Sequence, residues 1–166
     1  MSAPLFSTVE REYNRRIAEA LCEYGYDLFL PQEAVDRVRT QDPAAFGGDA
    51  TSQREVIARL SFDACLDGIA SSDLVIALLD GADVDSGTAW EVGYAYARGI
   101  PVVGVRSDKR SMQRGPVNIM IKNALSASAF YDQPPADLEK LISDVVEVVK
   151  EALSDQQARA AVERPA

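Results

Sequence analysis

The stretch from residue 73 to 108 constrains the fold of this chain more than any other part of it. Residues 74–79 form an apolar run of the length expected for a buried strand. A turn rich in glycine and aspartate follows, and then a helical pattern from about Thr88 to Arg98, which Gly99 ends. Residues 102–105 supply a second apolar run. Strand, short helix and strand in this order predict a right-handed parallel crossover, the basic unit of α/β proteins.

Further strand and helix patterns lie on both sides of this crossover. We expect strands at 26–30 and 127–131, helices at 8–24, 53–70 and 138–153, and helical turns at 33–39 and 119–125, with a long loop over 32–52. The chain is therefore predicted to be one α/β domain over residues 1–153, with a flavodoxin-like or Rossmann-like parallel sheet of about five strands in a three-layer sandwich. The polar, alanine-rich residues 154–166 are expected to form a frayed tail.

Composition narrows the partners and the compartment. A formal net charge of −9 and a pI near 4.5 argue against nucleic acid or an acidic membrane surface as a partner. No apolar run approaches the ~20 residues of a membrane span, and no signal peptide is evident, so we expect a cytoplasmic protein. Cys22 and Cys65 lack metal-type spacing and are expected to be buried free thiols.

The chain contains no histidine. This excludes Ser-His-Asp and Cys-His catalysis and most zinc sites. Acid–base or nucleophilic chemistry therefore falls to carboxylates, tyrosines, lysines or thiols.

Two carboxylates are predicted to share one crevice. The loop over residues 80–87 follows a strand, and open α/β sheets bind ligands at the carboxyl ends of their strands. Asp85 lies in this loop, and Glu91 lies six residues later in the first turn of the predicted helix. The pair suggests acid, base or nucleophile chemistry on a small molecule.

Each of these carboxylates also has a purely structural interpretation. Thr88 and Glu91 have the spacing of a capping box, in which Glu91 accepts from the Thr88 amide. Asp85 fits an ordinary turn aspartate, and Asp80 fits a residue that only binds loop amides. Ser7 and Glu10 form a second capping-box pattern, at the start of the first helix.

Three segments carry a resemblance to a known family. Residues 83–105, DVDSGTAWEVGYAYARGIPVVGV, resemble the nucleoside 2-deoxyribosyltransferase family, in which an aspartate, a Gly-Thr pair and a glutamate stand at this spacing. Residues 3–21 look like the family's first loop and helix. Residues 115–120, GPVNIM, look like the segment that family members lend to a neighbouring subunit's active site.

The resemblance implies roles for four residues in their own subunit. Glu91 matches the family's nucleophile, and Asp85 matches a residue that contacts the bound nucleoside. Gly87, without a side chain, would let the ligand approach the backbone. Phe6 matches a loop that walls the base pocket, although an apolar staple for the first helix explains it as well.

Two further residues match positions that enter the adjacent subunit's site. Asn118 would position the sugar or the nucleophile, and Met120 would pack against the sugar. The structural alternatives are a loop asparagine and a core methionine. The resemblance therefore implies a homo-oligomer built from dimers, with sites completed in trans.

The implied reaction is transfer of a 2-deoxyribosyl group between nucleobases, as in nucleotide salvage. Glu91 would form a covalent deoxyribosyl-enzyme, which a second base attacks with overall retention of configuration. Deoxynucleosides and free nucleobases would be the partners, and neither a metal nor an organic cofactor would be needed. Two alternatives stay open: hydrolysis of a 2-deoxynucleoside 5′-monophosphate by a sister branch, and a non-catalytic nucleotide-sensing module.

The chain departs from the family's pattern in two places. Met1 falls where relatives finish a first strand that carries a tyrosine near its end, so we expect this strand to be very short or truncated. Cys65 stands near the position of an aspartate that faces the nucleobase in many relatives. Asp63 or Asp85 would then have to supply the proton to the leaving base.

Overall fold

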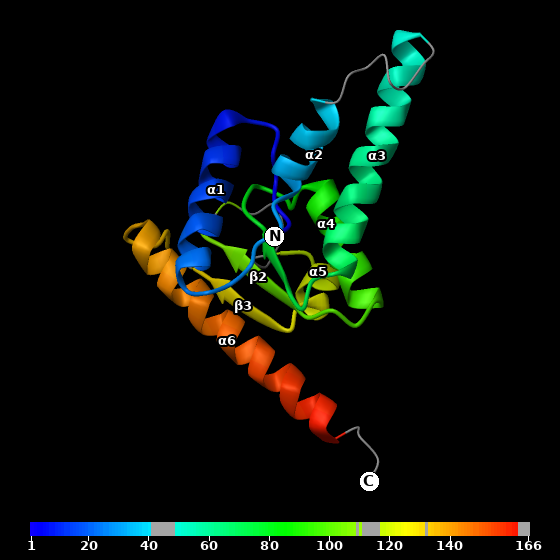
Figure 1. Cartoon of the computed structure of the whole chain (residues 1–166). Coiled ribbons are helices and arrows are strands. Elements are labelled where there is room, and N and C mark those ends of the chain that lie inside the picture. The colour runs from blue at the N-terminus through cyan, green and yellow to red at the C-terminus, as the bar shows by residue number, and fades with distance from the viewer. Residues whose placement is uncertain (41–48, 109, 111–116, 132, 163–166) are drawn as a thin grey trace.

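The computed structural model describes residues 1–40, 49–108, 110, 117–131 and 133–162. Its centre is a parallel sheet of three strands: β1 (Val75–Leu78), β2 (Val102–Arg106) and β3 (Ala127–Phe130). The strands lie in the order β1-β2-β3, with Val75 opposite Val102 and Val103 opposite Ala127 (Figure 1). The predicted parallel α/β class is therefore confirmed.

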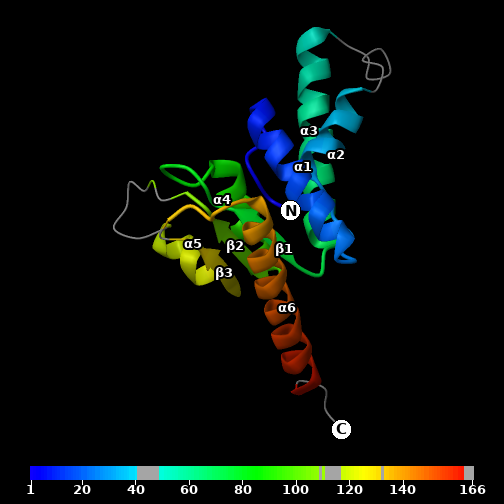
Figure 2. The same ribbon diagram turned by 90° about the vertical axis from the view of Figure 1, so that its left-hand side faces the viewer.

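Helices flank this sheet on both faces (Figures 1 and 2). They are α1 (Thr8–Glu23), α2 (Pro31–Arg39), α3 (Ala50–Ala70), α4 (Ser86–Ala97), α5 (Ile119–Ala124) and α6 (Leu138–Val162). Ile76 and Leu78 of β1 face the core shared with α1 and α6. Val75 and Ala77 alternate with them and face the core shared with α4. Residues that alternate along one strand thus hold the two helical layers to the sheet.

The expectation of about five strands is wrong for the described residues, where three strands are found. Residues 26–30, predicted as a strand, form no strand pairing. A strand requires a neighbouring backbone, and only Ser2 lies beside β1 on this side, in a single parallel bridge to Ala77. The Ser2 amide donates to the Ile76 carbonyl (2.7 Å), and the Ser2 carbonyl accepts from the Leu78 amide (2.8 Å).

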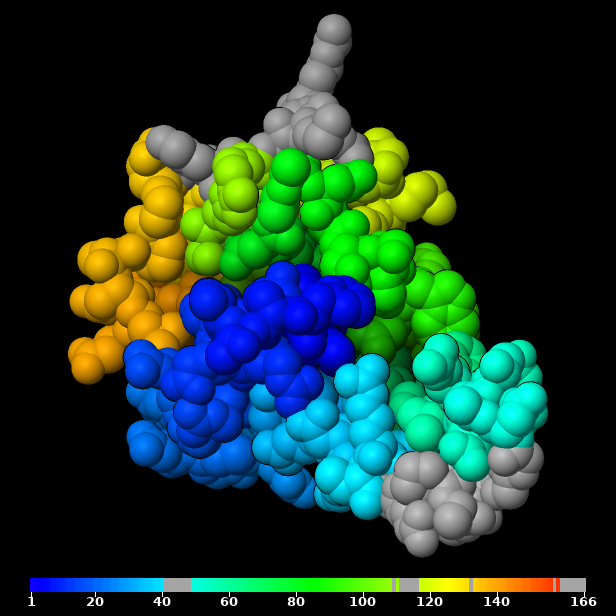
Figure 3. Space-filling model, turned by 90° about the horizontal axis from the view of Figure 1, so that it is seen from above, coloured from blue at the N-terminus to red at the C-terminus, as the bar shows by residue number. Residues whose placement is uncertain are grey.

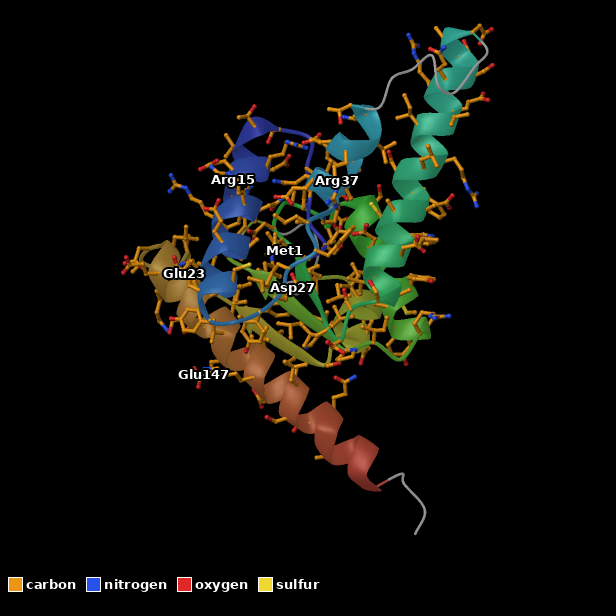
Figure 4. The ribbon with its side chains drawn as sticks, in the orientation of Figure 1. Met1, Arg15, Glu23, Asp27, Arg37 and Glu147 are labelled. Atoms are coloured by element: carbon orange, nitrogen blue, oxygen red, sulfur yellow. The ribbon has the colours of Figure 1, made fainter. Side chains whose placement is uncertain are left out.

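A groove follows from this short bridge. This groove is lined by Met1, the free edge of β1, residues 25–29, and the α6 side chains Val149 and Leu153. The Met1 amine donates to the Phe29 carbonyl (2.7 Å) and so ties the amino terminus to the opposite wall. Figure 4 shows Met1 near the centre of the molecule, beside the segment that carries Asp27.

Several boundaries differ from the sequence prediction. The predicted turn at 33–39 is the nine-residue helix α2, and α3 begins at Ala50 after the N-cap Asp49, three residues earlier than predicted. The helix α6 continues to Val162, so the expected frayed tail is helical over 154–162. Residues 41–48 of the predicted loop and 163–166 of the predicted tail lie outside the described residues.

Two further observations concern chemistry and location. Both thiols are free, but Cys22 is exposed and Cys65 is half-buried, so the prediction that both are buried is wrong. Among the described residues, no helix combines the length and apolar character that crossing a bilayer requires.

Candidate active site

The candidate site is built on α4, which follows the loop at the carboxyl end of β1. This loop turns at Gly81, whose φ of +116° is open to glycine and strained for other residues. Val92 and Ala95 are buried and fix one face of α4 in the core next to β1 and β2. In Figure 3 the amino-terminal segment, in dark blue, lies against the green region that contains this loop and α4.

Asp85, not Thr88, caps α4. Its carboxylate accepts from the Thr88 amide (2.9 Å), and the helix begins at Ser86. The predicted Thr88–Glu91 capping box is therefore wrong, because Thr88 is already a buried residue inside the helix. Asp85 thus has a structural role at this position, because its Oδ2 is directed at the helix start.

Glu91 is not a capping residue, and its carboxylate is held by Ser2. The Ser2 hydroxyl donates to Oε2 of Glu91 across 89 positions of sequence. Ser2 is buried and Glu91 is half-buried, so the contact lies in the interior, where the amino-terminal segment meets α4. Glu91 is therefore a carboxylate that the Ser2 hydroxyl orients and that does not cap α4.

The charge of Glu91 is set by several groups. Burial raises the pKa of its carboxyl above the ordinary value, the Ser2 hydrogen bond and the Met1 amine act in the opposite direction, and the Asp85 charge raises it further. Burial is therefore the largest influence on the charge of Glu91. Burial also lowers the pKa of the Met1 amine to about 6, while Glu91 and Cys65 oppose this shift.

Gly87 has a local reason to lack a side chain. A Cβ placed there would lie 3.1 Å from Oδ2 of Asp85, the oxygen that caps α4. A larger residue would therefore disturb the cap as well as cover the backbone beside Glu91.

Met120 and Phe6 are exposed on the single chain, and Asn118 is half-buried. Asn118 is the N-cap of α5, and its side-chain oxygen accepts from the Met120 amide (2.8 Å). Met120 is 78% exposed, so it is not a core methionine. Phe6 is 79% exposed, and the fourth residue of α1, against which a staple would pack, is Arg11. The structure thus brings Asp85 near Glu91, it leaves the Phe6 and Met120 side chains exposed to a ligand or another chain, and it engages the Asn118 oxygen in the cap of α5.

Sequence reasoning missed the groups closest to Glu91. Ser2 and the Met1 amine reach it from the far end of the chain, and Cys65 is close enough for the Glu91 charge to raise the pKa of its thiol, after burial as the main cause. No short-range pattern signals these contacts. Glu91 also borders a small hollow together with Met1, Phe29 and Gly68, with a cavity volume of about 10 Å³, which is too small for a nucleoside.

An aromatic cluster lies on the outer side of α4. Trp90 stacks on Tyr94 (ring centroids 5.5 Å apart, 7° between planes) and meets Phe62 of α3 at 5.5 Å. Trp90 is half exposed, and Phe62 is also exposed. A cluster of exposed rings beside a half-buried carboxylate is the kind of surface that aromatic ligands or partner chains cover.

The fold and the site together define an α/β protein with a pair of neighbouring carboxylates, one on a loop and one on a helix, at the carboxyl end of a parallel strand. The family model of nucleoside 2-deoxyribosyltransferase matches residues 1–158, almost the whole chain. The chain belongs to the nucleoside 2-deoxyribosyltransferase family.

Solved structures agree with this fold. A conserved protein from Enterococcus faecalis V583 is 26% identical, with a TM-score of 0.61 over 90% of this chain and 94% of that one. A 2-deoxyribosyltransferase from the psychrotolerant bacterium Bacillus psychrosaccharolyticus is 22% identical, with a TM-score of 0.58 over 84% of this chain and 92% of that one. No curated protein matches this chain.

Proposed function

We propose that this protein transfers a 2-deoxyribosyl group from a deoxynucleoside to a free nucleobase. The observation that carries the proposal is the placement of Glu91: a half-buried carboxylate held by the Ser2 hydroxyl, near Asp85, in a chain of the nucleoside 2-deoxyribosyltransferase family. The name of the solved Bacillus psychrosaccharolyticus structure points to the same activity.

Glu91 is the nucleophile in this proposal. Its carboxylate attacks the anomeric carbon, the bond to the nucleobase breaks, and the base leaves with the bonding electron pair and takes up a proton. A second base then attacks the same carbon, gives up its ring N–H proton to water and releases Glu91, so configuration is retained overall, as in retaining glycosidases. The Ser2 hydroxyl binds one carboxylate oxygen and leaves the other for the sugar.

Asp85, Gly87 and Phe6 bind the substrate in this proposal. Asp85 accepts hydrogen bonds from the nucleoside and raises the proton affinity of Glu91 through its charge. Gly87 leaves the backbone beside these carboxylates uncovered. The exposed ring of Phe6 stacks on or walls the nucleobase. The leaving base takes its proton from solvent water in this proposal, because Asp85 acts as a charged carboxylate and the Cys65 thiol, with a pKa raised to about 11, holds its proton tightly.

The site is completed by a second copy of the chain. Asn118 caps α5 and Met120 lies on it, and α5 packs against α4 and leaves Met120 exposed. The small hollow beside Glu91 is insufficient for a nucleoside within one subunit. A dimer in which α5 of one subunit approaches the crevice of the other supplies the missing wall.

One assay tests the reaction. The protein is incubated with deoxyinosine and free adenine, and separately with a deoxynucleoside 5′-monophosphate alone, and the products are separated chromatographically. Deoxyadenosine and hypoxanthine are the expected products of the first mixture, with ping-pong kinetics. The monophosphate is expected to be the poorer substrate, because the Asp85 carboxylate would repel a phosphate dianion at short range.

The variant Asp85→Ser sharpens this assay. Transfer is expected to weaken, and the difference between nucleoside and monophosphate is expected to narrow, because the repelling charge is gone. If the unaltered protein prefers the monophosphate and releases free base without an acceptor, the transferase proposal is wrong and the sister hydrolase reaction takes its place.

A further inference from the structure

Outside Glu91 and its neighbours, a set of reciprocal hydrogen bonds joins two loops at the carboxyl end of the sheet. One loop follows β1 and leads to Asp85. The other segment follows β2. The Arg106 side chain donates to backbone carbonyls at the end of β1 and in the loop after it, and the Asp80 side chain accepts from backbone amides in the segment after β2. We call this set the Asp80–Arg106 clamp.

Arg106 is the last residue of β2, and it is 3% exposed. Its guanidinium donates to the carbonyls of Leu79 and Gly81, the latter at 2.6 Å, and to the Arg110 carbonyl. A buried guanidinium is costly unless its N–H groups are paired. Among the described residues Arg106 takes part in no ion pair, so backbone carbonyls satisfy it and their positions are set by its rigid, planar donors.

Asp80 makes the opposite connection. Its carboxylate accepts from the Ser107 amide (2.6 Å), the Ser107 hydroxyl (2.8 Å) and the Asp108 amide (2.8 Å). Three charge-assisted hydrogen bonds on one carboxylate are stronger and more directional than neutral ones. The Ser107 hydroxyl also lies 3.5 Å from the Tyr13 hydroxyl of α1.

The backbone between Asp80 and Asp85 has little conformational freedom. Gly81 has a φ of +116°, and a Cβ placed there would lie 2.9 Å from the Asp83 carbonyl oxygen. This tight turn begins at Gly81, whose carbonyl Arg106 holds, and it ends at Asp85, which caps α4. A shift of Gly81 is therefore passed on to Asp85 and to the start of α4.

We propose that Asp80 and Arg106 are positioning residues that set the place of Asp85 and of the first turn of α4. They touch no substrate, and they act by holding the β1–α4 loop to the segment after β2. The inference rests on the proposed function for its kinetic part, and its structural part stands independently.

The test uses Asp80→Ala and Arg106→Met, with Tyr131→Phe as the matched control. The control removes the hydrogen bond from the Tyr131 hydroxyl to Asp144 of α6 (2.7 Å), and it leaves in place the clamp and the neighbouring backbone hydrogen bond from the Tyr131 amide to the Arg106 carbonyl (3.1 Å). Backbone amide exchange is measured over residues 84–89, whose amides contact neither clamp side chain. Asp80→Ala and Arg106→Met are each expected to speed this exchange about tenfold, and the control is expected to leave it unchanged.

Kinetics are measured at a temperature where every variant is fully folded. Both clamp variants are expected to lower kcat about 10- to 100-fold with a smaller change in KM, because misplacement of a reacting group by about 1 Å has effects of this size. The double variant is expected to lose less than the product of the two single losses, since the residues act as one unit. Asp80→Asn is expected to restore part of kcat.

The two proposals fail in different ways. Unchanged exchange over residues 84–89 in both clamp variants overturns the clamp, and so does a kcat loss no greater than that of Tyr131→Phe. If the unaltered protein neither transfers nor hydrolyses, the proposed function is wrong, and the exchange result still decides whether the clamp positions Asp85.

Discussion

Glu91 shows how a single carboxyl group is adjusted by parts of the chain that are distant in sequence. The Ser2 hydroxyl reaches it from the amino terminus, and Asp85 acts on its charge from the preceding loop. Burial is the largest influence on its pKa, which lies above the ordinary value. A carboxylate with a higher pKa is more basic and a better nucleophile once it is deprotonated.

Replacement of this residue by its amide separates chemistry from packing. Glu91→Gln is expected to lower turnover at least ~10³-fold, because an amide does not form the covalent sugar intermediate. The fold is expected to persist, since the Gln oxygen still accepts the Ser2 hydrogen bond. Product chromatography and the melting temperature measure the two effects. A variant that keeps most of its activity would remove Glu91 from the mechanism.

The pH dependence of stability provides a second prediction for Glu91. Its folded-state pKa lies above the unfolded value of 4.5, so the folded state binds the proton more tightly. The stability from this shift is fully present below pH 4.5 and is lost as pH rises through the folded-state pKa. The unfolding free energy of the unaltered protein, relative to Glu91→Gln, is therefore expected to fall over this interval. Denaturant titrations of both proteins at a series of pH values measure the difference, and a flat difference would contradict it.

At the scale of elements, the start of α4 joins a cap to the site. Asp85→Asn keeps a good capping oxygen but removes the charge, so stability is expected to change by only a few tenths of a kcal/mol. Asp85→Ala removes both, and it is expected to lose ~0.5–2 kcal/mol. If the substrate-binding role is correct, both variants weaken turnover. A loss confined to Asp85→Ala would make Asp85 a cap alone. Thermal unfolding and the transfer assay distinguish these outcomes.

Two helical glycines form a matched pair for packing. A Cβ at Gly68 in α3 would lie 2.3 Å from the ring of Phe29, whereas a Cβ at Gly93 in α4 meets nothing within 4 Å. Gly68→Ala is expected to destabilise by roughly 1–3 kcal/mol, because the ring must move. Gly93→Ala is expected to stabilise by ~0.5–1 kcal/mol through helix propensity. Denaturant unfolding measures both changes. Equal changes in the free energy of unfolding for Gly68→Ala and Gly93→Ala would mean that Phe29 does not pack against α3.

The elements also show what the sequence was able to predict. Continuous apolar runs located β1 and β2 to within one residue, because buried parallel strands have this pattern, and β3 also lies within one residue of the predicted strand. The strand predicted at 26–30 is wrong, because an apolar pattern describes the side chains of a segment and does not show whether a neighbouring backbone is present to pair with it. Beyond Ser154, α6 continues because alanine, glutamine and arginine favour a helix without an apolar stripe.

The site was predicted less completely than the sheet. The motif placed Asp85 and Glu91 near each other, and the structure agrees. The capping box at Thr88 was wrong because Asp85 starts the helix three residues earlier, and a spacing rule does not choose between two possible starts. The contact between Ser2 and Glu91 depends on the whole fold, so local patterns carry no sign of it.

At the scale of the whole molecule, assembly makes a quantitative prediction. An inactive Glu91→Ala chain is unfolded and refolded together with an inactive Asn118→Ala chain, so that dimers form at random. Half of the dimers are hybrids, and each hybrid has one site with both residues intact. Recovery of about a quarter of the unaltered activity is therefore expected for sites completed in trans.

The controls for this mixture are simple. Each variant refolded alone is expected to remain inactive, and both are checked for a folded far-ultraviolet spectrum. Light scattering gives the oligomer size. A fully active monomer would contradict assembly of the site from two subunits.

The burial of the amino terminus has a practical consequence for work with this protein. A peptide fused ahead of Met1 has to leave through the groove between residues 25–29 and β1, and it displaces the hydrogen bond to the Phe29 carbonyl. Ser2 is the next residue, and it holds Glu91. An affinity tag at this end is therefore expected to disturb Glu91, the proposed nucleophile, even though the tag lies far from Glu91 in sequence. The far end of α6 projects away from the sheet in Figure 1, and a tag placed beyond it leaves this contact untouched.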